Sequence, residues 1–434
     1  MYSVILSLLT IFFINTWWIF LTIVFFFLWR SFYLYWLQDK FWMSLEWAAL
    51  EVKLPQEVSK TPKAMETALE TIFALYDPAN LKEKWFDGKV LLHYSFEIVG
   101  IGGEGIHVYI IVPSTHIQLI RTALYSQYPE AEIQEIERGK LKEVGEYLKK
   151  VPQDVPNEEY DLWGSDLTLL KPDPYPLKTY TFWQREEFRE ERAVDPLATI
   201  FEFLSSLREG EHIWIQILAR PITNERPWKA DGEKLAAKIM GRKPKTAPGL
   251  FEPLYVGKMP EDVAGVLIEG KPIPERIPGE EEVPEATLFK LTPGESEIIR
   301  AIEENIAKQP YETNVRFLYI GRRDVFAKPQ IASFFGHFSQ FGSANLNSLV
   351  PDITKTKTFP WFFERRRLYH KQRKLYRYYI RRRFPWHRAP YVLSSAELAT
   401  FFHFPSYREA PVPGIKRVEQ KKGGPPQFLP SEEF

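Results

Sequence analysis

The chain has 434 residues and carries 56 basic and 56 acidic side chains, so its formal net charge is zero. This balance provides no overall field that would attract nucleic acid, and any charged surface must come from local clustering. The chain contains no cysteine, which excludes disulfides, thiolate metal ligands and a cysteine nucleophile and suits a cytoplasmic location.

Residues 1–29 carry no charged side chain and are long enough to cross a bilayer as a single helix. A secretory signal would need a positively charged start, a short apolar core and a small-residue cleavage site, which this segment lacks. We therefore predict an uncleaved, single-pass transmembrane helix. Basic residues only follow the span, beginning with Arg30, Lys40 and Lys53. We expect the N-terminus outside and the soluble region in the cytoplasm, at the inner membrane.

The next two regions are predicted to be a juxtamembrane segment over 30–59 and an α+β domain over 60–220. The first is rich in aromatic residues that suit the headgroup zone, and we expect a helix over 31–54. The second alternates amphipathic helices with stretches rich in Val, Ile, Tyr and Phe, and it divides into two units. The expected elements are helices at 61–75, 115–127 and 195–204, and strands at 90–99, 106–112, 131–136, 179–183 and 212–219.

A connector rich in Pro, Gly, Lys and Glu is predicted over 221–288, with one short helix at 232–240. A third α/β unit follows over 289–350 and opens with a capping box, in which Thr292 is the N-cap and Glu295 the third helical residue. Its further elements are a strand at 315–320 and a helix at 331–341. The expected fold class is α+β, with an N-terminal transmembrane helix, tandem ferredoxin-like α/β sandwich units and a basic helical C-terminal segment.

The short motifs that carry catalytic or metal-binding chemistry are missing from the sequence. The glycine-rich stretch 100–105 precedes a strand rather than a helix, so we interpret it as a hairpin turn and not as a phosphate loop. Residues 164–166, Gly-Ser-Asp, lie in a proline-rich stretch and are also interpreted as a turn. No His-Glu-x-x-His or Gly-x-Ser-x-Gly pattern occurs. We predict no catalytic residue, no cofactor and no metal ligand, and a membrane-associated enzyme is the least favoured alternative.

Residues 351–390 are predicted to form a basic, aromatic helical segment, whose helix ends before Pro385. Anionic lipid is the favoured partner, because the anchor keeps this segment near a membrane. One alternative is nucleic acid, whose bases would stack on the aromatic side chains. The other is a solvated helix that pairs with acidic surface elsewhere. The basic residues are Arg365, Arg366, Arg367, Lys371, Arg373, Lys374, Arg377, Arg381, Arg382, Arg383 and Arg388.

Residues 391–434 are predicted to be a C-terminal docking tail. Ser394 and Glu397 have the spacing of a capping box and would begin a short helix. We interpret the apolar face of this helix as a docking face for a partner, and burial in the core of the chain itself is the alternative. The residues of that face are Leu398, Phe401 and Phe402.

Several segments of the sequence are similar to a family of bacterial membrane proteins. They are Leu-Glu-Val-Lys-Leu-Pro at 50–55, Ser-Phe-Glu-Ile-Val at 95–99, Lys-Pro-Asp-Pro-Tyr-Pro at 171–176, Gly-Glu-His-Ile-Trp-Ile-Gln at 210–216 and Glu-Leu-Ala-Thr-Phe-Phe-His-Phe-Pro at 397–405. The chain resembles an uncharacterised family of candidate-phyla bacteria, which in turn resembles the N-terminal region of conjugation and type IV secretion ATPases of the FtsK/HerA class. The stretch at 397–405 is the most specific, because in fused proteins it lies shortly before the nucleotide-binding core.

This sequence ends at Phe434 without such a core, so the resemblance implies anchoring and a place beside a motor but not ATPase activity. We expect a non-catalytic, membrane-anchored scaffold or accessory subunit of a type IV secretion, conjugation or DNA-translocation ATPase. The alternative is a membrane-tethered nucleic-acid-binding module that uses residues 365–388. The expected partners are the membrane, an ATPase and anionic lipid, while nucleic acid and a further copy of the chain are left open.

Overall fold

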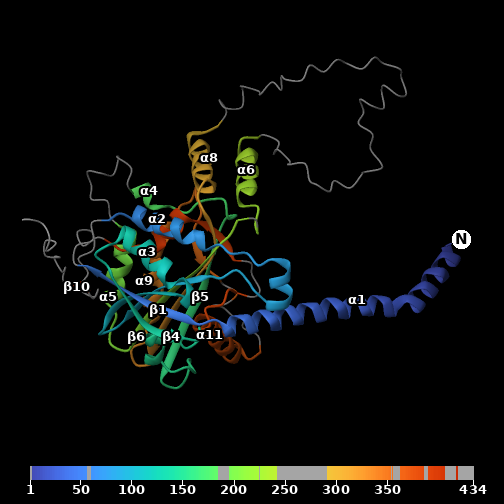
Figure 1. The fold of residues 1–434 in the computed structure, drawn as a ribbon, viewed down its shortest axis with the longest axis horizontal. Coiled ribbons are helices and arrows are strands. Elements are labelled where there is room, and N and C mark those ends of the chain that lie inside the picture. The colour runs from blue at the N-terminus through green and yellow to red at the C-terminus, as the bar shows by residue number, and fades with distance from the viewer. Residues whose placement is uncertain are drawn as a thin grey trace, which may run out of the picture.

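The computed structural model describes most of the chain (Figure 1). The described residues are 2–55, 60–183, 195–223, 225–241, 291–352, 354, 362–385, 390–405 and 417–418. The α-helices are α1 (Tyr2–Ser44), α2 (Pro62–Ile72), α3 (Ile117–Gln127), α4 (Tyr180–Trp183), α5 (Pro196–Ser205), α6 (Trp228–Ile239), α8 (Pro293–Ile306), α9 (Lys328–Phe338), α11 (Glu364–Ile380) and α12 (Ser395–Phe401). The strands are β1 (Trp47–Pro55), β2 (Tyr94–Ile101), β3 (Gly105–Pro113), β4 (Glu132–Gly139), β5 (Tyr160–Leu169), β6 (Glu211–Pro221), β7 (Pro310–Arg322), β8 (Leu349–Pro351), β9 (Tyr391–Ser394) and β10 (Arg417–Val418).

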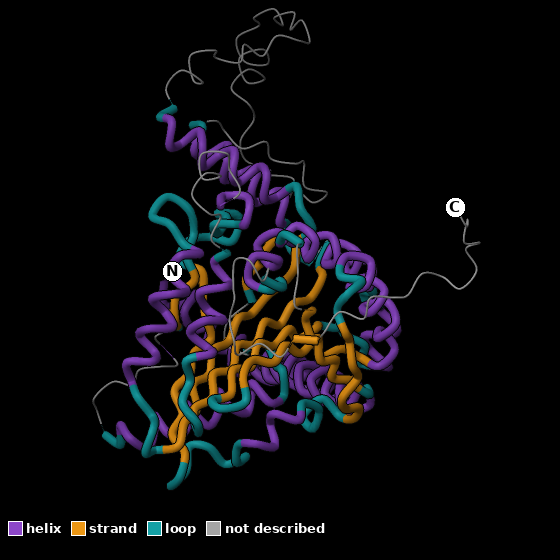
Figure 2. Tube along the Cα trace, turned by 90° about the vertical axis from the view of Figure 1, so that its left-hand side faces the viewer, coloured by secondary structure: helices purple, strands orange, loops and turns teal. Residues whose placement is uncertain are grey.

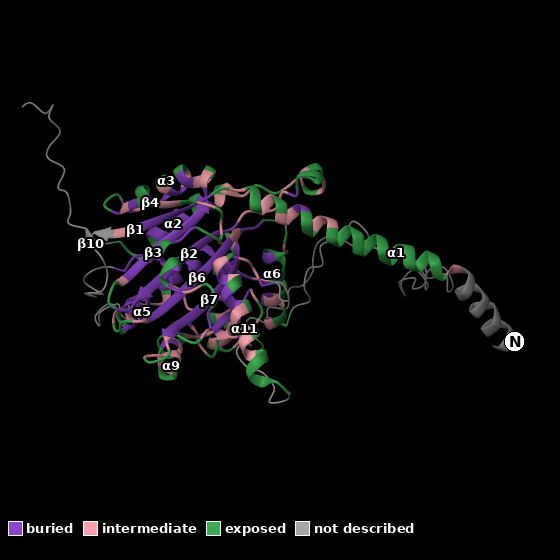
Figure 3. Cartoon of the chain, turned by 90° about the horizontal axis from the view of Figure 1, so that it is seen from below, coloured by how far each residue is buried: buried purple, intermediate pink, exposed green. Residues whose placement is uncertain are grey.

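Helix α1 is apolar and projects from the body of the protein (Figures 1 and 3). Its part Thr16–Ser44 is long and apolar enough to cross a membrane, a property that membrane spans share with signal sequences. The predicted apolar N-terminal helix is therefore confirmed. The helix expected over 31–54 is wrong beyond Ser44, where the chain turns into β1. Pairing with β3 on one side and β4 on the other holds this stretch extended.

The body is built on a single sheet, which contains ten strands among the described residues (Figure 2). The strands run in the order β10-β1-β3-β2-β6-β7-β5-β8, with β4 also paired to β1 and β9 to β7. Neighbouring strands are antiparallel, apart from the short parallel contact of β10 with β1. The predicted α+β class is confirmed.

The sheet consists of two halves with the same connectivity. The first half runs β1-α2-β2-β3-α3-β4 along the chain and has the spatial order β4-β1-β3-β2. The second half runs β5-α5-β6-β7-α9-β8 and has the spatial order β8-β5-β7-β6. Strands β2 and β6 join the halves, from Tyr94 opposite Ala219 to Ile101 opposite His212. The strands of the predicted second and third units therefore lie together in one half of a continuous sheet.

Two apolar clusters cover the two faces of this sheet, whose central strands are buried (Figure 3). On the first face, α2, α3, α5, α9 and α12 pack against strand residues that include Phe96 and Phe317. On the second face, α11 and a segment that carries Val144 and Tyr147 pack against Trp214 and its neighbours. Because side chains alternate along a strand, β6 contributes to both clusters. The first face is thus a helical layer, and the second is a smaller aromatic one.

Helices α6 and α8 project side by side from one end of the sheet, between β6 and β7 in the chain (Figure 1). They close a small cluster of their own around Trp228 and Ile302. A Cβ on Gly232 would lie 2.3 Å from Ile306 Cγ2, so the glycine lets the two helices approach closely. The helix expected at 232–240 is found, although it begins about a turn earlier. The rest of the predicted connector, over 242–288, lies outside the described residues.

Most of the locally encoded elements are confirmed. The helices expected at 61–75, 115–127, 195–204 and 331–341 correspond to α2, α3, α5 and α9, and the strands expected at 90–99, 106–112, 131–136, 212–219 and 315–320 to β2, β3, β4, β6 and β7. Both capping boxes form with their two reciprocal hydrogen bonds, at Thr292 and at Ser394. The stretch 100–105 ends β2, turns and begins β3, with φ of +84° at Gly103.

Two further local expectations are wrong. Residues 179–183, expected to be a strand, contain the short helix α4. The Gly-Ser-Asp sequence at 164–166, interpreted as a turn, lies inside β5, where the three residues are paired with Leu318, Phe317 and Arg316 of β7. Long-range pairing with β7 therefore overrides the local turn preference of these residues.

Candidate functional site

The basic segment forms helix α11, which lies on the second face of the sheet and ends beside α1 (Figure 1). One side of the helix is buried through Leu375, Tyr376 and Tyr379. Trp214 of β6 lies against both tyrosines, with ring centroids 6.2 and 5.3 Å apart. The opposite side carries basic residues. The helix is therefore amphipathic, with an aromatic face toward the sheet and a basic face outward.

The close approach of α11 to the sheet depends on Gly164 in β5. A Cβ at this position would lie 2.8 Å from Leu375 Cδ2 and 2.4 Å from Leu318 Cδ2. Any side chain here would have to displace α11 or its neighbour on β7. The glycine that resembles a turn residue in the sequence is thus the place where the helix rests on the strand.

A row of polar side chains crosses the sheet beneath α11. Glu97, Gln216, Arg316 and Asp166 are opposite one another on β2, β6, β7 and β5, and all four are buried. Gln216 Nε2 donates to Glu97 Oε1 at 2.9 Å, and Arg316 Nη1 donates to Gln216 Oε1 at 2.8 Å. Arg316 Nε donates to Asp166 Oδ1 at 2.7 Å. The row therefore connects the two halves of the sheet across the β2–β6 joint.

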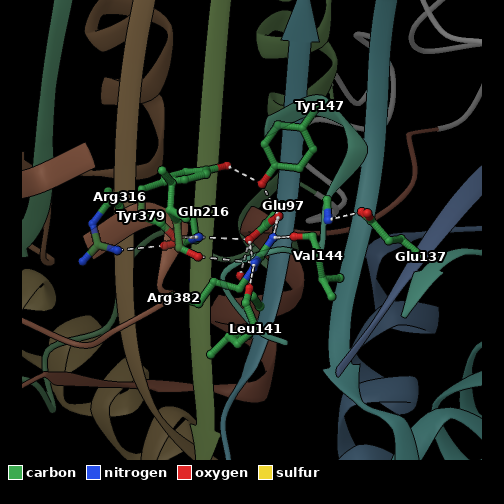
Figure 4. Close-up of polar contacts among 12 residues, drawn as sticks. Glu97, Glu137, Leu141, Val144, Tyr147, Gln216, Arg316, Tyr379 and Arg382 are labelled. Atoms are coloured by element: carbon green, nitrogen blue, oxygen red, sulfur yellow. Dashed lines mark hydrogen bonds and ion pairs between the residues drawn. The ribbon is translucent and has the colours of Figure 1, made fainter. Parts of the chain in front are cut away.

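Arg382, just after α11, inserts its side chain into this row (Figure 4). Its Nε donates to Glu97 Oε1 at 2.8 Å and its Nη2 to Glu97 Oε2 at 3.2 Å. The same guanidinium donates to the carbonyl oxygens of Leu141 at 2.6 Å and Val144 at 2.8 Å. The Glu97 and Arg382 side chains are both 0% exposed. This bidentate ion pair fixes the end of α11 in one position, because its two hydrogen bonds form together only in that position.

Two hydroxyl groups complete the surroundings of Glu97. Tyr147 Oη donates to Glu97 Oε2 at 2.5 Å, and Ser95 Oγ donates to Glu97 Oε1 at 2.7 Å. Burial disfavours the charged form of Glu97, but Arg382 and these hydrogen bonds outweigh it, so the pKa of Glu97 lies below its ordinary value. Burial, with the adjacent carboxylate, raises the pKa of Tyr147 well above its ordinary value. The network is enclosed and charge-balanced, and its effect is to position α11.

The residues that follow Arg382 attach this helix to α1. Arg383 forms an ion pair with Asp39 of α1. His93 lies between Trp42 of α1 and Phe384, with ring centroids 4.8 and 5.1 Å apart. Burial lowers the pKa of His93 to about 3, so this ring is neutral and packs as an aromatic group. The basic helix and the apolar helix are therefore joined at their ends.

The basic residues predicted to bind lipid or nucleic acid fall into distinct groups. The exposed ones are Arg365, Arg366, Arg367, Lys374, Arg377 and Arg381. The partly buried ones are Lys371, Arg373 and Arg383. Arg382 is buried in its ion pair with Glu97, which makes it a positioning residue, and Arg388 lies outside the described residues. Lys374, Arg377 and Arg381 recur at helical spacing and share one outward stripe.

The predicted docking face of the C-terminal tail needs correction. Leu398, Phe401 and Phe402 are all buried in the core of the chain. Phe402 packs on Phe96 of β2 with ring centroids 4.9 Å apart, and Phe401 packs on Phe341 at 4.6 Å. Helix α12 follows β9, which pairs with β7. This pairing places α12 against the sheet, with its apolar face toward the core. Of the tail residues that follow α12, only 402–405 and 417–418 belong to the described part of the chain.

Sequence reasoning missed Glu97 and Asp166, the acidic partners that organise the second face. A usable signal exists for Glu97, because it is a lone charge in the otherwise uncharged strand Tyr94–Ile101. Charged residues are almost never fully buried unless they are paired. A lone carboxylate in such a strand therefore predicts a buried cation elsewhere in the chain.

Comparison with known proteins identifies a family that covers most of the chain. A family model described as a domain of unknown function (DUF8128) matches residues 38–410. The match begins near the end of α1 and extends past α12, so it includes both halves of the sheet and α11. A comparison with curated proteins gives no match.

Proposed function

We propose, since this chain belongs to the DUF8128 family, that it is a non-catalytic, membrane-anchored scaffold whose body is held on anionic lipid by α11. The observation that carries the proposal is the ion pair between Arg383 and Asp39, which joins the basic helix to the apolar helix α1. A bilayer around α1 would therefore lie on the side of the body where α11 ends. Each basic residue near an anionic surface contributes about 1 kcal/mol of attraction.

The faces of α11 favour lipid over nucleic acid as the partner. A single strand of nucleic acid is held by aromatic side chains that stack on successive bases. Tyr376 and Tyr379 are buried against the sheet and cannot serve in this way. Exposed cations at the base of a transmembrane helix are sufficient for an anionic lipid surface.

We infer that the two halves of the sheet are tandem ferredoxin-like units. Each half has β-α-β-β-α-β connectivity, and its two helices contribute to the apolar cluster on the first face of the sheet. The basic residues that follow the span, such as Arg30 and Lys40, support a cytoplasmic body with the N-terminus outside, at the inner membrane. In this arrangement the two units form one platform, and α11 lies across the joint between them.

The resemblance of residues 397–405 to the region before a motor core supports a place for this scaffold beside a type IV secretion, conjugation or DNA-translocation ATPase. Affinity purification of the full chain from its native membrane, followed by mass spectrometry, tests this part of the proposal. Recovery of such an ATPase is the expected result. Recovery of the chain without one would count against the motor partner and leave the lipid contact to be judged separately.

Spin labelling of the cysteine-free chain tests the lipid contact. We would label His370→Cys, which is exposed on α11, in nanodiscs that contain phosphatidylglycerol and a nickel-chelating lipid headgroup. Contact with the surface brings the label near the nickel and accelerates its relaxation. We expect a strong effect in these discs, a weak one in discs with only zwitterionic lipid in place of phosphatidylglycerol, and a further decrease at high salt.

Charge reversal then identifies the contacting surface. The variant Arg366→Glu, Lys374→Glu, Arg377→Glu should remove the relaxation effect at residue 370. A matched triple reversal of exposed lysines on α6, Lys229→Glu, Lys234→Glu and Lys238→Glu, should leave it unchanged. Equal relaxation in all three proteins would mean that α11 does not hold the body on the membrane. Salt-sensitive binding of single-stranded DNA that is lost only in the α11 variant would favour the nucleic-acid alternative.

A further inference from the structure

Residues 76–89, which we call the collar loop, connect the end of α2 to the approach of β2 and lie along α1 (Figure 1). Three contacts join the loop to α1. A Cβ on Gly88 would lie 2.4 Å from Leu37 O, so only a glycine permits this approach. Tyr33 Oη donates to Trp85 O at 3.2 Å. The Arg30 guanidinium lies over the Trp85 ring, 5.2 Å from its centroid.

The contacts on α1 run from Leu37 to Tyr33 to Arg30, toward the apolar end of the helix. Seven residues of α-helix correspond to about 10 Å of rise. The collar loop therefore extends from the body to the level of Arg30. Arg30 is the first charged residue after the charge-free stretch 1–29, so this level is where α1 would leave the hydrocarbon of a bilayer.

The collar loop also exposes two large apolar side chains. Leu81 is 78% exposed and Phe86 is 72% exposed. Lys82 and Lys84 are exposed beside them. Apolar tips flanked by lysines are typical of segments that lie in the membrane interface, where the tips enter the acyl region and the ammonium groups reach the headgroups.

The loop is braced internally, so its apolar tips are held in this exposed arrangement. Asn80 Oδ1 accepts from Glu83 N at 2.9 Å, and Glu83 Oε2 accepts from Asn80 N at 3.0 Å. Lys89 Nζ bridges Asp77 at 2.8 Å and Glu83 at 3.3 Å. These bonds pin both ends of the loop segment that carries Leu81 and Phe86. Exposure of the two side chains is thus built into the fold of the loop.

We propose that the collar loop is a second membrane contact, which inserts Leu81 and Phe86 into the boundary between headgroups and acyl chains of the leaflet from which α1 emerges. The loop contacts α1 at Arg30, where α1 would leave the hydrocarbon of a bilayer. This contact favours lipid as the partner of the exposed surface. The proposal rests on one part of the proposed function, namely that α1 spans the bilayer. Together with α11, the collar loop would fix the body at one angle to the membrane.

Single cysteines in the otherwise cysteine-free chain provide the test. We would attach a nitroxide at Leu81→Cys, Phe86→Cys or Lys84→Cys in the full chain, reconstituted in phosphatidylcholine–phosphatidylglycerol vesicles. Phe25→Cys within the apolar part of α1 serves as the reference for the span. Collisional relaxation by oxygen, which concentrates in the acyl region, is compared with relaxation by a water-soluble nickel chelate.

The expected result is severalfold greater relaxation by oxygen than by nickel at residues 81, 86 and 25, and the reverse at residue 84. Nickel-dominated relaxation at 81 and 86, with oxygen-dominated relaxation at 25, would overturn the collar-loop proposal and leave the span intact. Nickel-dominated relaxation at 25 as well would overturn the span and, with it, the proposed function. Exclusion of both reagents from 81 and 86 would mean contact with a second copy of the chain and would also overturn the proposal.

Discussion

Each face of the sheet buries a glutamate, and the pKa values of these two carboxyl groups are shifted in opposite directions. Glu97 and Glu397 are both almost completely inaccessible to solvent. Burial disfavours the charge of Glu97, but the guanidinium of Arg382 outweighs it and holds the pKa of Glu97 below its ordinary value. Burial raises the pKa of Glu397 to about 7, although the backbone amides of Leu177 and Ser394 donate to it. Neutral hydrogen-bond donors around Glu397 thus do not offset the desolvation that a cation offsets at Glu97.

This difference shows how the two layers are held. The helices on the first face pack mainly through apolar area, together with the buried Asp195–His403 pair, and Glu397 serves there as a helix cap. Helix α11 on the second face is also fixed by a charge pair whose partners are 285 residues apart in the chain. Apolar packing is tolerant of small shifts, whereas a two-pronged ion pair specifies one position. A helix that must present a charged surface to a partner at a set place benefits from the second kind of attachment.

The largest expected effect comes from breaking the buried ion pair. Arg382→Ala leaves the Glu97 charge buried and uncompensated, so we expect the free energy of unfolding to fall by about 3–5 kcal/mol. Urea unfolding of the full chain in nanodiscs, followed by circular dichroism, measures this loss. Arg381→Ala, next in the chain but exposed, is the matched control and should have little effect. Equal losses in both variants would show that the pair does not hold α11.

A double variant separates the charge from the packing in the same experiment. Glu97→Gln with Arg382→Met removes both charges and keeps similar volumes, so most of the lost stability should return. Because the pKa of Glu97 is lowered, the stability that its charge contributes is present above its ordinary pKa and is lost as the pH falls through the lowered value. Acid should therefore weaken the wild type more than the double variant.

A second effect is expected from Glu397, with the opposite dependence on pH. The folded chain retains the proton on Glu397 up to a pKa of about 7, whereas the unfolded chain releases it near the ordinary value of 4.5. As the pH rises between these values, Glu397 should lower the free energy of unfolding by up to about 1.4 kcal/mol per pH unit. Glu397→Gln should remove this slope, because a glutamine does not ionise and keeps one oxygen for the helix cap. An unchanged slope in the variant would mean that Glu397 is ionised in the folded chain.

Local chemistry explains which elements the sequence predicts well. The capping boxes at Thr292 and Ser394 need only residues within one helical turn, and both are present in the structure. Gly164 shows the limit of such reasoning. A glycine is required there because Leu318 and Leu375, which are distant in the chain, leave no room for a Cβ. A local pattern assigns Gly164 to a turn, since nothing nearby reveals the helix that rests on it.

The candidate site was also predictable only in part: the sequence predicts the basic helix but not which of its arginines is buried. The composition of residues 365–388 predicts a basic helix, and the helix is present over Glu364–Ile380. Arg381, Arg382 and Arg383 are chemically identical, and only the distant Glu97 determines that Arg382 is the buried one. In the same way, the apolar face of α12 indicates burial without naming its partner, which proves to be the chain's own sheet.

The smallest effect on stability should come from the exposed cations of α11, and this separates the two sides of the helix. Arg366→Glu, Lys374→Glu and Arg377→Glu alter side chains that are exposed, so each should change the free energy of unfolding by less than about 0.5 kcal/mol. Urea unfolding of the triple variant in zwitterionic nanodiscs measures this without a contribution from anionic lipid. Near-wild-type stability, together with loss of the lipid contact, would show that the outer side of α11 meets the membrane while the inner side holds the fold. A loss as large as that of Arg382→Ala would instead assign the outer cations to the structure of the body.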